Sequence, residues 1–393
     1  MTVLKGDQST TRLLNRRLIL NHIRKNGASS RGQLSEHTGL SPAAITAVTT
    51  ELLQEELLTE VGHKRPVPLD IHYKKHHAIG VKLLEDRLEG VLTDLSTQVI
   101  QEITLDLPNH DPLTVARAIH HLQTQLSILT NTPFERIVGI GLGLPGLIDA
   151  ERGVCIKSAR FGWLDISLSS LISQHTQLPV WVDNDVNAYT TAERLYGQAR
   201  HLSHFIVVSI GRGIGSGIVI DNKIHRGLHG AAGEFGHTLV QRNGRPCECG
   251  RLGCLEAYTS EKAILEHYQS LTGMQRGANI TGLVRLAENG HEAASEVLAE
   301  AGKRLGEAIA SYVNLLAPQQ VILCGEGTAW GEPFFRPMRE AYQQGVYAED
   351  ALHLPITVVE HRPDAWTRGA ASLAVEHFFD FESSKAEITP RSG

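Results

Sequence analysis

The stretch GEFGHTLVQRNGRPCECGRLGCLEAYTS, residues 233–260, carries the strongest local signal in the sequence. Within it, His237, Cys247, Cys249 and Cys254 form a His-x9-Cys-x-Cys-x4-Cys set. One imidazole and three thiolates suit tetrahedral zinc, and four protein ligands leave no open position for an activated water. Cysteines separated by one residue rarely form an unstrained disulfide, and exposed thiols this close together oxidise readily without a metal. The sequence therefore predicts one structural zinc ion per chain, which pins this loop.

The rest of the composition is that of an ordinary globular chain. Its 393 residues, 41% of them hydrophobic, can bury the cores of two or three domains and exclude disorder of the whole chain. No apolar run approaches the ~18 residues of a membrane span, and the N-terminus lacks the apolar core of a signal peptide. The five cysteines, three of them clustered, fit a metal in a reducing compartment. We expect a cytoplasmic protein that is not a membrane protein.

Charge is distributed unevenly along the chain. Residues 1–76 contain eleven Lys/Arg and seven Asp/Glu, a balance of +4, whereas the whole chain has a net charge of −6. A basic first module ahead of an acidic body points to a polyanion partner for that module alone. The charge pattern by itself fits a solvated helix face equally well.

The basic module carries the sequence signals of three short helices. Residues 12–26 read as a helix that stops at Gly27, and residues 30–38 as a second helix that ends at Gly39. A third helix opens with Ser41 as its N-cap. The pattern predicts a helix-turn-helix whose third helix enters a major groove, followed by two wing strands.

Small side chains on that third helix permit close approach to bases, and basic side chains can hold phosphates or enter a minor groove. We assign to DNA contact Arg12, Arg16, Arg17 and Arg31 on phosphates, Ser41, Ala43, Ala44, Thr46, Ala47 and Thr50 on the third helix, and Lys64 and Arg65 in the wing. A three-helix protein-docking domain without nucleic acid is the alternative reading.

From about residue 77 the sequence alternates β-rich runs with helical stretches, which indicates an α/β body with two lobes. The expected organisation is a winged helix-turn-helix with its linker, a smaller lobe, a larger lobe that carries the zinc loop, and a flexible tail. The corresponding ranges are 1–76, 77–190 with 365–380, 191–364, and 381–393.

Three further motifs accompany the zinc loop. They are GIGLGLPGLID at 139–149, VDNDVNAYTTAE at 182–193, and SIGRGIGSGIVIDNKIHRGLHGAAGEFGH at 209–237. Together with the zinc loop they resemble the signatures of the ROK family (repressors, open reading frames and sugar kinases), over nearly all of the chain from residue 77 to 379. The resemblance implies a two-lobed actin-like (ribonuclease-H-like) fold that binds a sugar in the cleft between the lobes.

The resemblance also implies which side chains contact the sugar: Asn184, Asp185, Glu234, His237 and Glu256. Carboxylates and an amide are suitable partners for sugar hydroxyls, which both donate and accept hydrogen bonds. His237 can bind zinc through one ring nitrogen and face the sugar with the other. In kinases of the family, the equivalent of Asp185 is the general base for phosphoryl transfer.

The nucleotide loops depart from the family's kinase pattern. Kinases of the family open the first lobe with an Asp-x-Gly-Gly-Thr turn, but this chain has Lys82 near the Asp position and Leu84, Glu85 and Asp86 in place of the turn. These side chains prevent close backbone approach to phosphates, and the two carboxylates repel ATP. We therefore expect no ATP-dependent catalysis and no catalytic residues.

The combination of a DNA-binding head and a sugar site predicts a sugar-responsive transcriptional regulator, a repressor of genes for carbohydrate uptake or catabolism. Its expected partners are a palindromic operator, a sugar or sugar-phosphate effector, and further copies of the chain in a homodimer or tetramer. Two alternatives stay open at this point. One is a ROK sugar kinase with an appended head, and the other is a repressor controlled by a sugar-transport protein.

Overall fold

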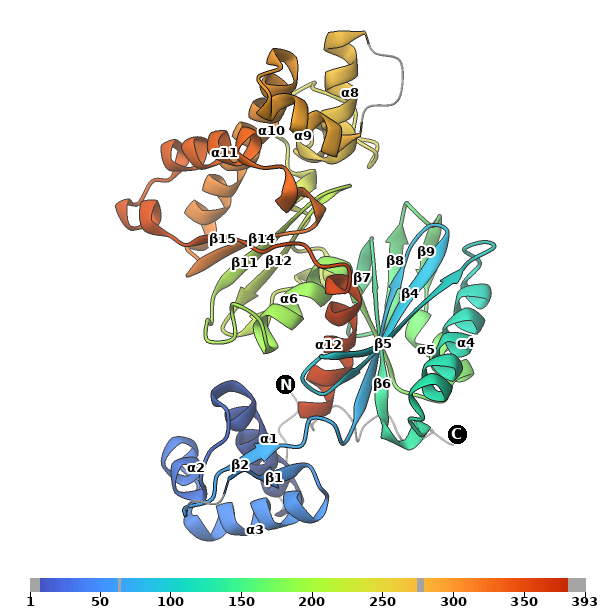
Figure 1. The fold of residues 1–393 in the computed structure, drawn as a ribbon, viewed down its shortest axis with the longest axis vertical. Helices are drawn as coiled ribbons and strands as arrows, with labels where there is room; N and C mark the ends of the chain where they lie inside the picture. The colour runs from blue at the N-terminus through green and yellow to red at the C-terminus, as the bar shows by residue number, and fades with distance from the viewer. Residues whose placement is uncertain (1–7, 63–64, 274–278, 381–393) are drawn as a thin grey trace. The chain divides into compact units, whose positions relative to one another are not determined.

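The computed structural model describes residues 8–62, 65–273 and 279–380, and it divides the chain into two compact units (Figure 1). The first unit is Met1–His201 with Trp366–Gly393, and the second is Leu202–Ala365. The boundary thus follows His201 and not residue 190, because the whole of helix α6 (Asp185–Leu195) belongs to the first unit. The expected tail, 381–393, lies outside the described residues. Among the helices described, none is long and apolar enough to cross a membrane.

The first unit begins with the helical head. Its elements are α1 (Gln8–Asn26), α2 (Arg31–Thr38), α3 (Pro42–Gln54), β1 (Leu58–Glu60) and β2 (Leu69–Ile71). Two predicted helix ends are confirmed: Gly39 ends α2 in the left-handed conformation, and Ser41 accepts a hydrogen bond from Ala44 N. Ser30, which was expected to be the first residue of α2, is its N-cap and forms a capping box with Gln33. The strands β1 and β2 pair antiparallel, so the head is a winged helix-turn-helix.

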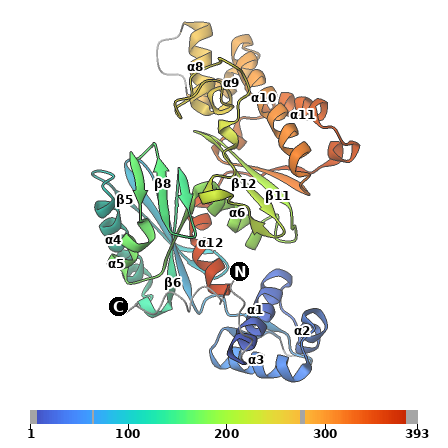
Figure 2. The same ribbon diagram turned by 180° about the vertical axis from the view of Figure 1, so that it is seen from behind.

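The body of the first unit is a five-stranded sheet in the order β10-β6-β3-β4-β5. The strands are β3 (His77–Leu83), β4 (Arg87–Asp94), β5 (Val99–Asp106), β6 (Ile137–Leu144) and β10 (Val180–Asn184), and a smaller sheet holds β7 (Leu147–Asp149), β8 (Val154–Ser158) and β9 (Trp163–Ile166). Helices α4 (Pro112–Thr130) and α5 (Leu168–Thr176) cover one face, and α12 (Ala365–Phe379) lies on the other (Figure 2). The packing of α12 is close: a β-carbon at Gly141 would lie 1.8 Å from Ala370 O.

The second unit repeats the same sheet plan in the order β13-β12-β11-β14-β15. In each unit, three antiparallel strands precede two parallel ones, which is the ribonuclease-H-like arrangement that the resemblance implies. The strands are β11 (Phe205–Ile210), β12 (Ile214–Ile220), β13 (Lys223–Ile224), β14 (Gln320–Cys324) and β15 (Ile356–Val358). The helices are α7 (Glu256–Thr259), α8 (Glu261–Thr272), α9 (Ile280–Glu288), α10 (Glu292–Leu316) and α11 (Glu332–Gly345).

The contact between α10 and α11 depends on glycine. A β-carbon at Gly302 in α10 would lie 2.1 Å from Phe334 O in α11, and backbone atoms cannot move aside as a flexible side chain can. We expect Gly302→Ala to destabilise the second unit by about 1–3 kcal/mol. At Gly32 in α2 a β-carbon would meet only Ser30 Oγ, at 4.0 Å, so Gly32→Ala is the matched control, with no expected loss of stability. Calorimetric unfolding of both variants tests this prediction. If Gly302→Ala unfolds at the same temperature as the wild type, α10 and α11 move apart to admit the methyl group without a loss of stability.

Candidate functional site

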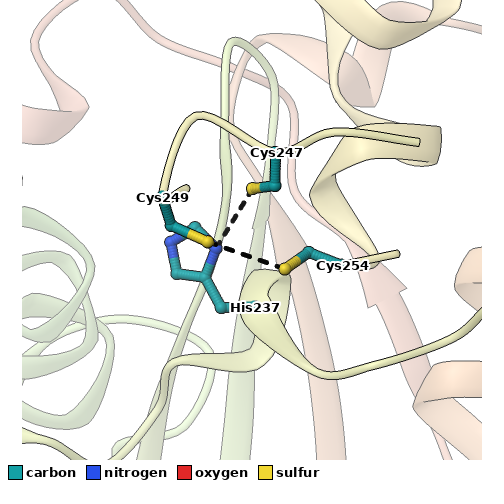
Figure 3. A group of neighbouring side chains, drawn as sticks. All are labelled: His237, Cys247, Cys249 and Cys254. Atoms are coloured by element: carbon teal, nitrogen blue, oxygen red, sulfur yellow. Dashed lines mark hydrogen bonds between the residues drawn. The ribbon is translucent and has the colours of Figure 1, made fainter. Parts of the chain in front are cut away.

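The four predicted zinc ligands come together in the second unit. His237, Cys247, Cys249 and Cys254 place their ligand atoms within 4.8 Å of one another (Figure 3). The Sγ atoms of Cys249 and Cys254 lie 3.7 Å apart, and Cys247 Sγ lies 3.6 Å from His237 Nδ1. Zinc–sulfur bonds of about 2.3 Å at tetrahedral angles require sulfur–sulfur separations close to 3.8 Å. The donor set and its spacing therefore fit a zinc ion with closed coordination.

The loop around these ligands is shaped by glycines and has little core of its own. Gly253 has a φ of 79°, and a β-carbon there would lie 1.8 Å from Gln241 O. Short bridges pair Leu239 with Cys254 and Pro246 with Leu252. Since Leu239 and Leu252 are 64% and 52% exposed, apolar burial contributes little to holding the loop. The bound metal would supply the missing stabilisation.

The thiols differ in acidity. Burial raises the pKa of Cys247 to about 12. Burial also acts to raise the pKa of Cys249, but hydrogen bonds from Arg251 outweigh it and lower that pKa to about 6. Cys249 is therefore the most acidic of the three thiols, and a metal that binds here would displace protons from the other two.

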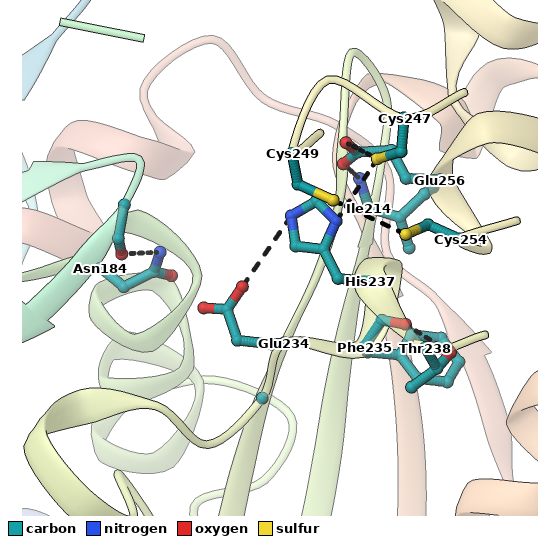
Figure 4. Close-up of polar contacts among 12 residues, drawn as sticks. Asn184, Ile214, Glu234, Phe235, His237, Thr238, Cys247, Cys249, Cys254 and Glu256 are labelled. Atoms are coloured by element: carbon teal, nitrogen blue, oxygen red, sulfur yellow. Dashed lines mark hydrogen bonds and ion pairs between the residues drawn. The ribbon is translucent and has the colours of Figure 1, made fainter. Parts of the chain in front are cut away.

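Two of the expected sugar ligands, Glu256 and Glu234, lie next to the His/Cys cluster. Glu256 opens α7 two residues after Cys254, and its Oε2 accepts a hydrogen bond of 2.9 Å from Ile214 N at the start of β12. Glu234 Oε2 lies 3.9 Å from His237 Nε2 (Figure 4). His237 thus turns Nδ1 toward the cysteines and Nε2 toward Glu234, so a metal on Nδ1 would fix the face that the histidine offers to a ligand.

The other two expected sugar ligands lie in the first unit, where β10 passes into α6. Asn184 is the N-cap of α6: its side chain accepts from Val186 N and donates to Gly146 O at 3.2 Å. Asp185 is the first residue of the helix. The neighbouring Asp183 is buried and accepts hydrogen bonds from Asn184 N and Asn187 Nδ2, which makes it a support for the motif. Each unit therefore presents its own group of polar side chains.

Side chains lie beside the loops that would approach nucleotide phosphates. In the first unit, Lys82 Nζ lies 4.5 Å from the ring centroid of Trp366. In the second unit, a β-carbon at Gly211 would lie 2.4 Å from Glu326 Oε2, so this carboxylate takes the space beside the glycine-rich turn. Burial and the charge of Glu326 raise the pKa of Glu261, and the charge of Arg212 opposes them. Sequence reasoning missed this contact, because residues 211 and 326 are far apart in the chain.

The head presents most of the predicted DNA-contacting side chains to solvent. Exposed positions on α3 are Ser41, Ala43, Thr46, Ala47 and Thr50, and Ala44 is half-buried. Arg65 is exposed, whereas Lys64 lies outside the described residues.

Of the four arginines predicted to contact phosphates, three are exposed or partly exposed and one is buried. The Arg12 side chain is 63% exposed beside Glu51, and Arg31 and Arg17 are partly exposed, with Arg31 donating to Thr49 Oγ1. The assignment of Arg16 is wrong. Its side chain is only 9% exposed and pairs with Glu51 and Glu55 of α3, so it joins two helices of the head and is not available to a phosphate.

A winged helix-turn-helix joined to an actin-like body with obstructed phosphate loops defines a transcriptional regulator and not a kinase. Comparison with known proteins agrees. Residues 78–377 match the ROK family, and residues 12–59 match a winged helix-turn-helix DNA-binding family. The chain belongs to the ROK family.

Relatives align over both parts of the chain. The xylose repressor of Bacillus subtilis (strain 168) is 31% identical over 385 residues, which cover 95% of this chain and 98% of the repressor. The N-acetylglucosamine repressor of Escherichia coli O157:H7 is 29% identical, covering 82% and 83%.

Among solved structures, a ROK family transcriptional regulator described as a homolog of the E. coli MLC protein aligns with a TM-score of 0.84 and 25% identity, covering 94% of this chain and 97% of that one. A ROK hexokinase from Thermus thermophilus aligns with a TM-score of 0.66 and 27% identity, covering 77% and 99%.

Proposed function

We propose that this chain is a sugar-responsive repressor that binds operator DNA through its head and an aldose through Asn184, Asp185, Glu234, His237 and Glu256. The proposal is supported by one contrast in the second unit, between the carboxylates beside the His/Cys cluster and the carboxylate beside the phosphate loop. Glu234 and Glu256 stand beside the His/Cys cluster ready for sugar hydroxyls, whereas Glu326 occupies the space beside the phosphate loop. Such a unit can recognise a sugar without transferring a phosphoryl group to it.

D-Xylose is the first effector to test, because the match to a xylose repressor covers 95% of this chain and 98% of that repressor. N-Acetylglucosamine is the second, on the match to a repressor of that name. A sugar phosphate is a third class to include. We infer a single zinc ion held by His237, Cys247, Cys249 and Cys254, which would position His237 and Glu256 and take no part in chemistry.

The DNA partner sets the expected assembly and location. One winged helix-turn-helix contacts too little DNA for gene-level specificity, so we infer a homodimer, or a tetramer built from dimers, on a palindromic operator near genes of carbohydrate metabolism. Because free, clustered cysteines suit a reducing compartment and a repressor must reach DNA, we infer a cytoplasmic protein.

Selection of genomic DNA fragments by the purified full chain tests the DNA half of the proposal, and a thermal-shift panel of sugars and sugar phosphates tests the effector half. Discrete palindromic fragments together with a sugar that raises the unfolding temperature support it. If fragments are found but no sugar binds, control by a sugar-transport protein becomes the better explanation. Phosphorylation of a sugar in a coupled ATP assay would overturn the assignment as a non-enzyme.

Glu256→Gln is expected to weaken sugar binding by about 10- to 100-fold, because a charge-assisted hydrogen bond contributes about 1.5–3 kcal/mol. The amide keeps an oxygen that can accept from Ile214 N, so the fold and the metal content should persist. Glu266→Gln, at an exposed position of α8, is the control. Calorimetric titration with the sugar found in the panel measures the effect, and equal affinities in the two variants would remove Glu256 from the sugar site.

A further inference from the structure

Helix α6 connects the expected sugar ligands of the first unit with the DNA-binding head. It begins at Asp185, with Asn184 as its N-cap, and ends at Leu195. An α-helix of this length spans about 16 Å. Eight of its eleven residues are buried, so the packed body surrounds it along its length. A helix held in this way moves as a rigid rod and does not bend locally.

The C-terminal end of α6 meets the head at Arg24 of α1. Arg24 Nη1 donates a hydrogen bond of 2.9 Å to Leu195 O, and its guanidinium carbon lies 5.7 Å from the ring centroid of Tyr196. Arg24 Nε donates to Asn21 Oδ1 at 3.2 Å, which fixes the guanidinium on α1. A cation at this position also meets the negative end of the helix dipole.

Apolar packing surrounds this polar contact. Leu195 belongs to the same buried cluster as Ile19 and Ile23 of α1, and that cluster also includes Val375 of α12. Tyr196 donates its hydroxyl to Leu95 O at 2.5 Å. The head therefore packs against the end of α6 through a continuous apolar core. The hydrogen bond from Arg24 fixes the position of α1 on that core.

We propose that Arg24 is a positioning residue that couples occupancy of the effector site at the start of α6 to the orientation of the DNA-binding head. This inference rests on the proposed function. A sugar that draws Asp185 and Asn184 toward its hydroxyls shifts α6, and the shift carries the Leu195 carbonyl with it. Because a hydrogen bond weakens steeply as its geometry departs from the optimum, Arg24 transmits the shift to α1.

The neighbouring residue of α1 provides a matched control. Lys25 lies beside Arg24 in the last turn of the helix, and among the described residues it makes no hydrogen bond or ion pair with α6. Lys25→Met and Arg24→Met thus each remove one positive charge from the same turn, but only Arg24→Met releases the end of α6.

The test measures, in the full chain, how far D-xylose weakens binding of a selected DNA fragment, with N-acetylglucosamine as the substitute if xylose does not bind. We expect at least tenfold weakening in the wild type and in Lys25→Met, and less than threefold in Arg24→Met. Sugar affinity by calorimetry should agree within twofold among all three. A full response in Arg24→Met would overturn the proposal.

Hydrogen exchange without sugar provides a second readout. Amides in the last turn of α1 should exchange at least fivefold faster in Arg24→Met than in Lys25→Met, while strands β3 and β6 remain protected in both. Equal rates in the two variants would overturn the proposal. If the wild type responds to no sugar, the proposed function fails, and the exchange rates still decide whether Arg24 holds the head to α6.

Discussion

Cys249→Ser is expected to remove the zinc ion and to yield a repressor that still binds DNA but no longer responds to sugar. Cys249 is exposed, so the substitution removes a ligand without opening a cavity. Structural zinc contributes about 10–16 kcal/mol of apparent binding free energy in zinc-finger peptides, and the loop here has little apolar burial to replace it. Loss of the metal should therefore release His237 and Glu256 together.

The effect should stay local. The main core of the second unit is built largely from β11, β14, α10 and α11, and Phe235 and Leu255 are its buried members from the stretch around the zinc ligands. The head belongs to the first unit. We expect zinc content to fall from one ion per chain to none, sugar affinity to fall by at least about 100-fold through loss of two ligands, and DNA affinity to stay within threefold.

Elemental analysis, calorimetry and a DNA-binding assay check these three quantities. Cys155→Ala removes a buried thiol of the first unit and should leave zinc and sugar response intact. A Cys249→Ser protein that keeps its zinc, or that loses zinc and stays fully inducible, would contradict the assignment of the cluster as a structural support for the sugar site.

Ala47→Glu is expected to weaken operator binding by at least about 100-fold, because it places a carboxylate among DNA phosphates and prevents close approach of α3. Ala47 is exposed on the outer face of that helix, so the fold of the head should not change. Ala47→Gln has nearly the same size without the charge and separates crowding from repulsion. Ala348→Glu makes the same charge change at an exposed site in the second unit.

Fluorescence anisotropy at one fixed salt concentration measures the effect, since affinity for DNA falls steeply with salt. Ala348→Glu should bind as the wild type does. If Ala47→Glu retains wild-type affinity, α3 is not the recognition helix, and the head is a protein-docking domain.

Short-range sequence patterns predicted the helices of the head and the His/Cys cluster. The helix ends follow from Ser30, Gly39 and Ser41, whose side chains or backbone conformations act within a few residues. The zinc ligands likewise lie close together in the sequence, so their spacing alone indicates the cluster.

Features that depend on distant contacts were not predictable in this way. The basic side chain of Arg16 looks like a phosphate contact until α3 brings Glu51 and Glu55 beside it. The placement of Glu326 against Gly211 needs β14 and β11 to be neighbours in the sheet. The boundary between the units depends on the packing of α6, which composition does not reveal.

The most direct test of the central claim is the dissociation constant of the full chain for one selected genomic fragment, measured with and without saturating sugar at near-physiological salt. A sugar-responsive repressor should bind the fragment specifically, and the bound sugar should raise the dissociation constant by at least about tenfold, the effect of about 1.4 kcal/mol of coupling. A dissociation constant that stays the same for every sugar that binds the protein would contradict it.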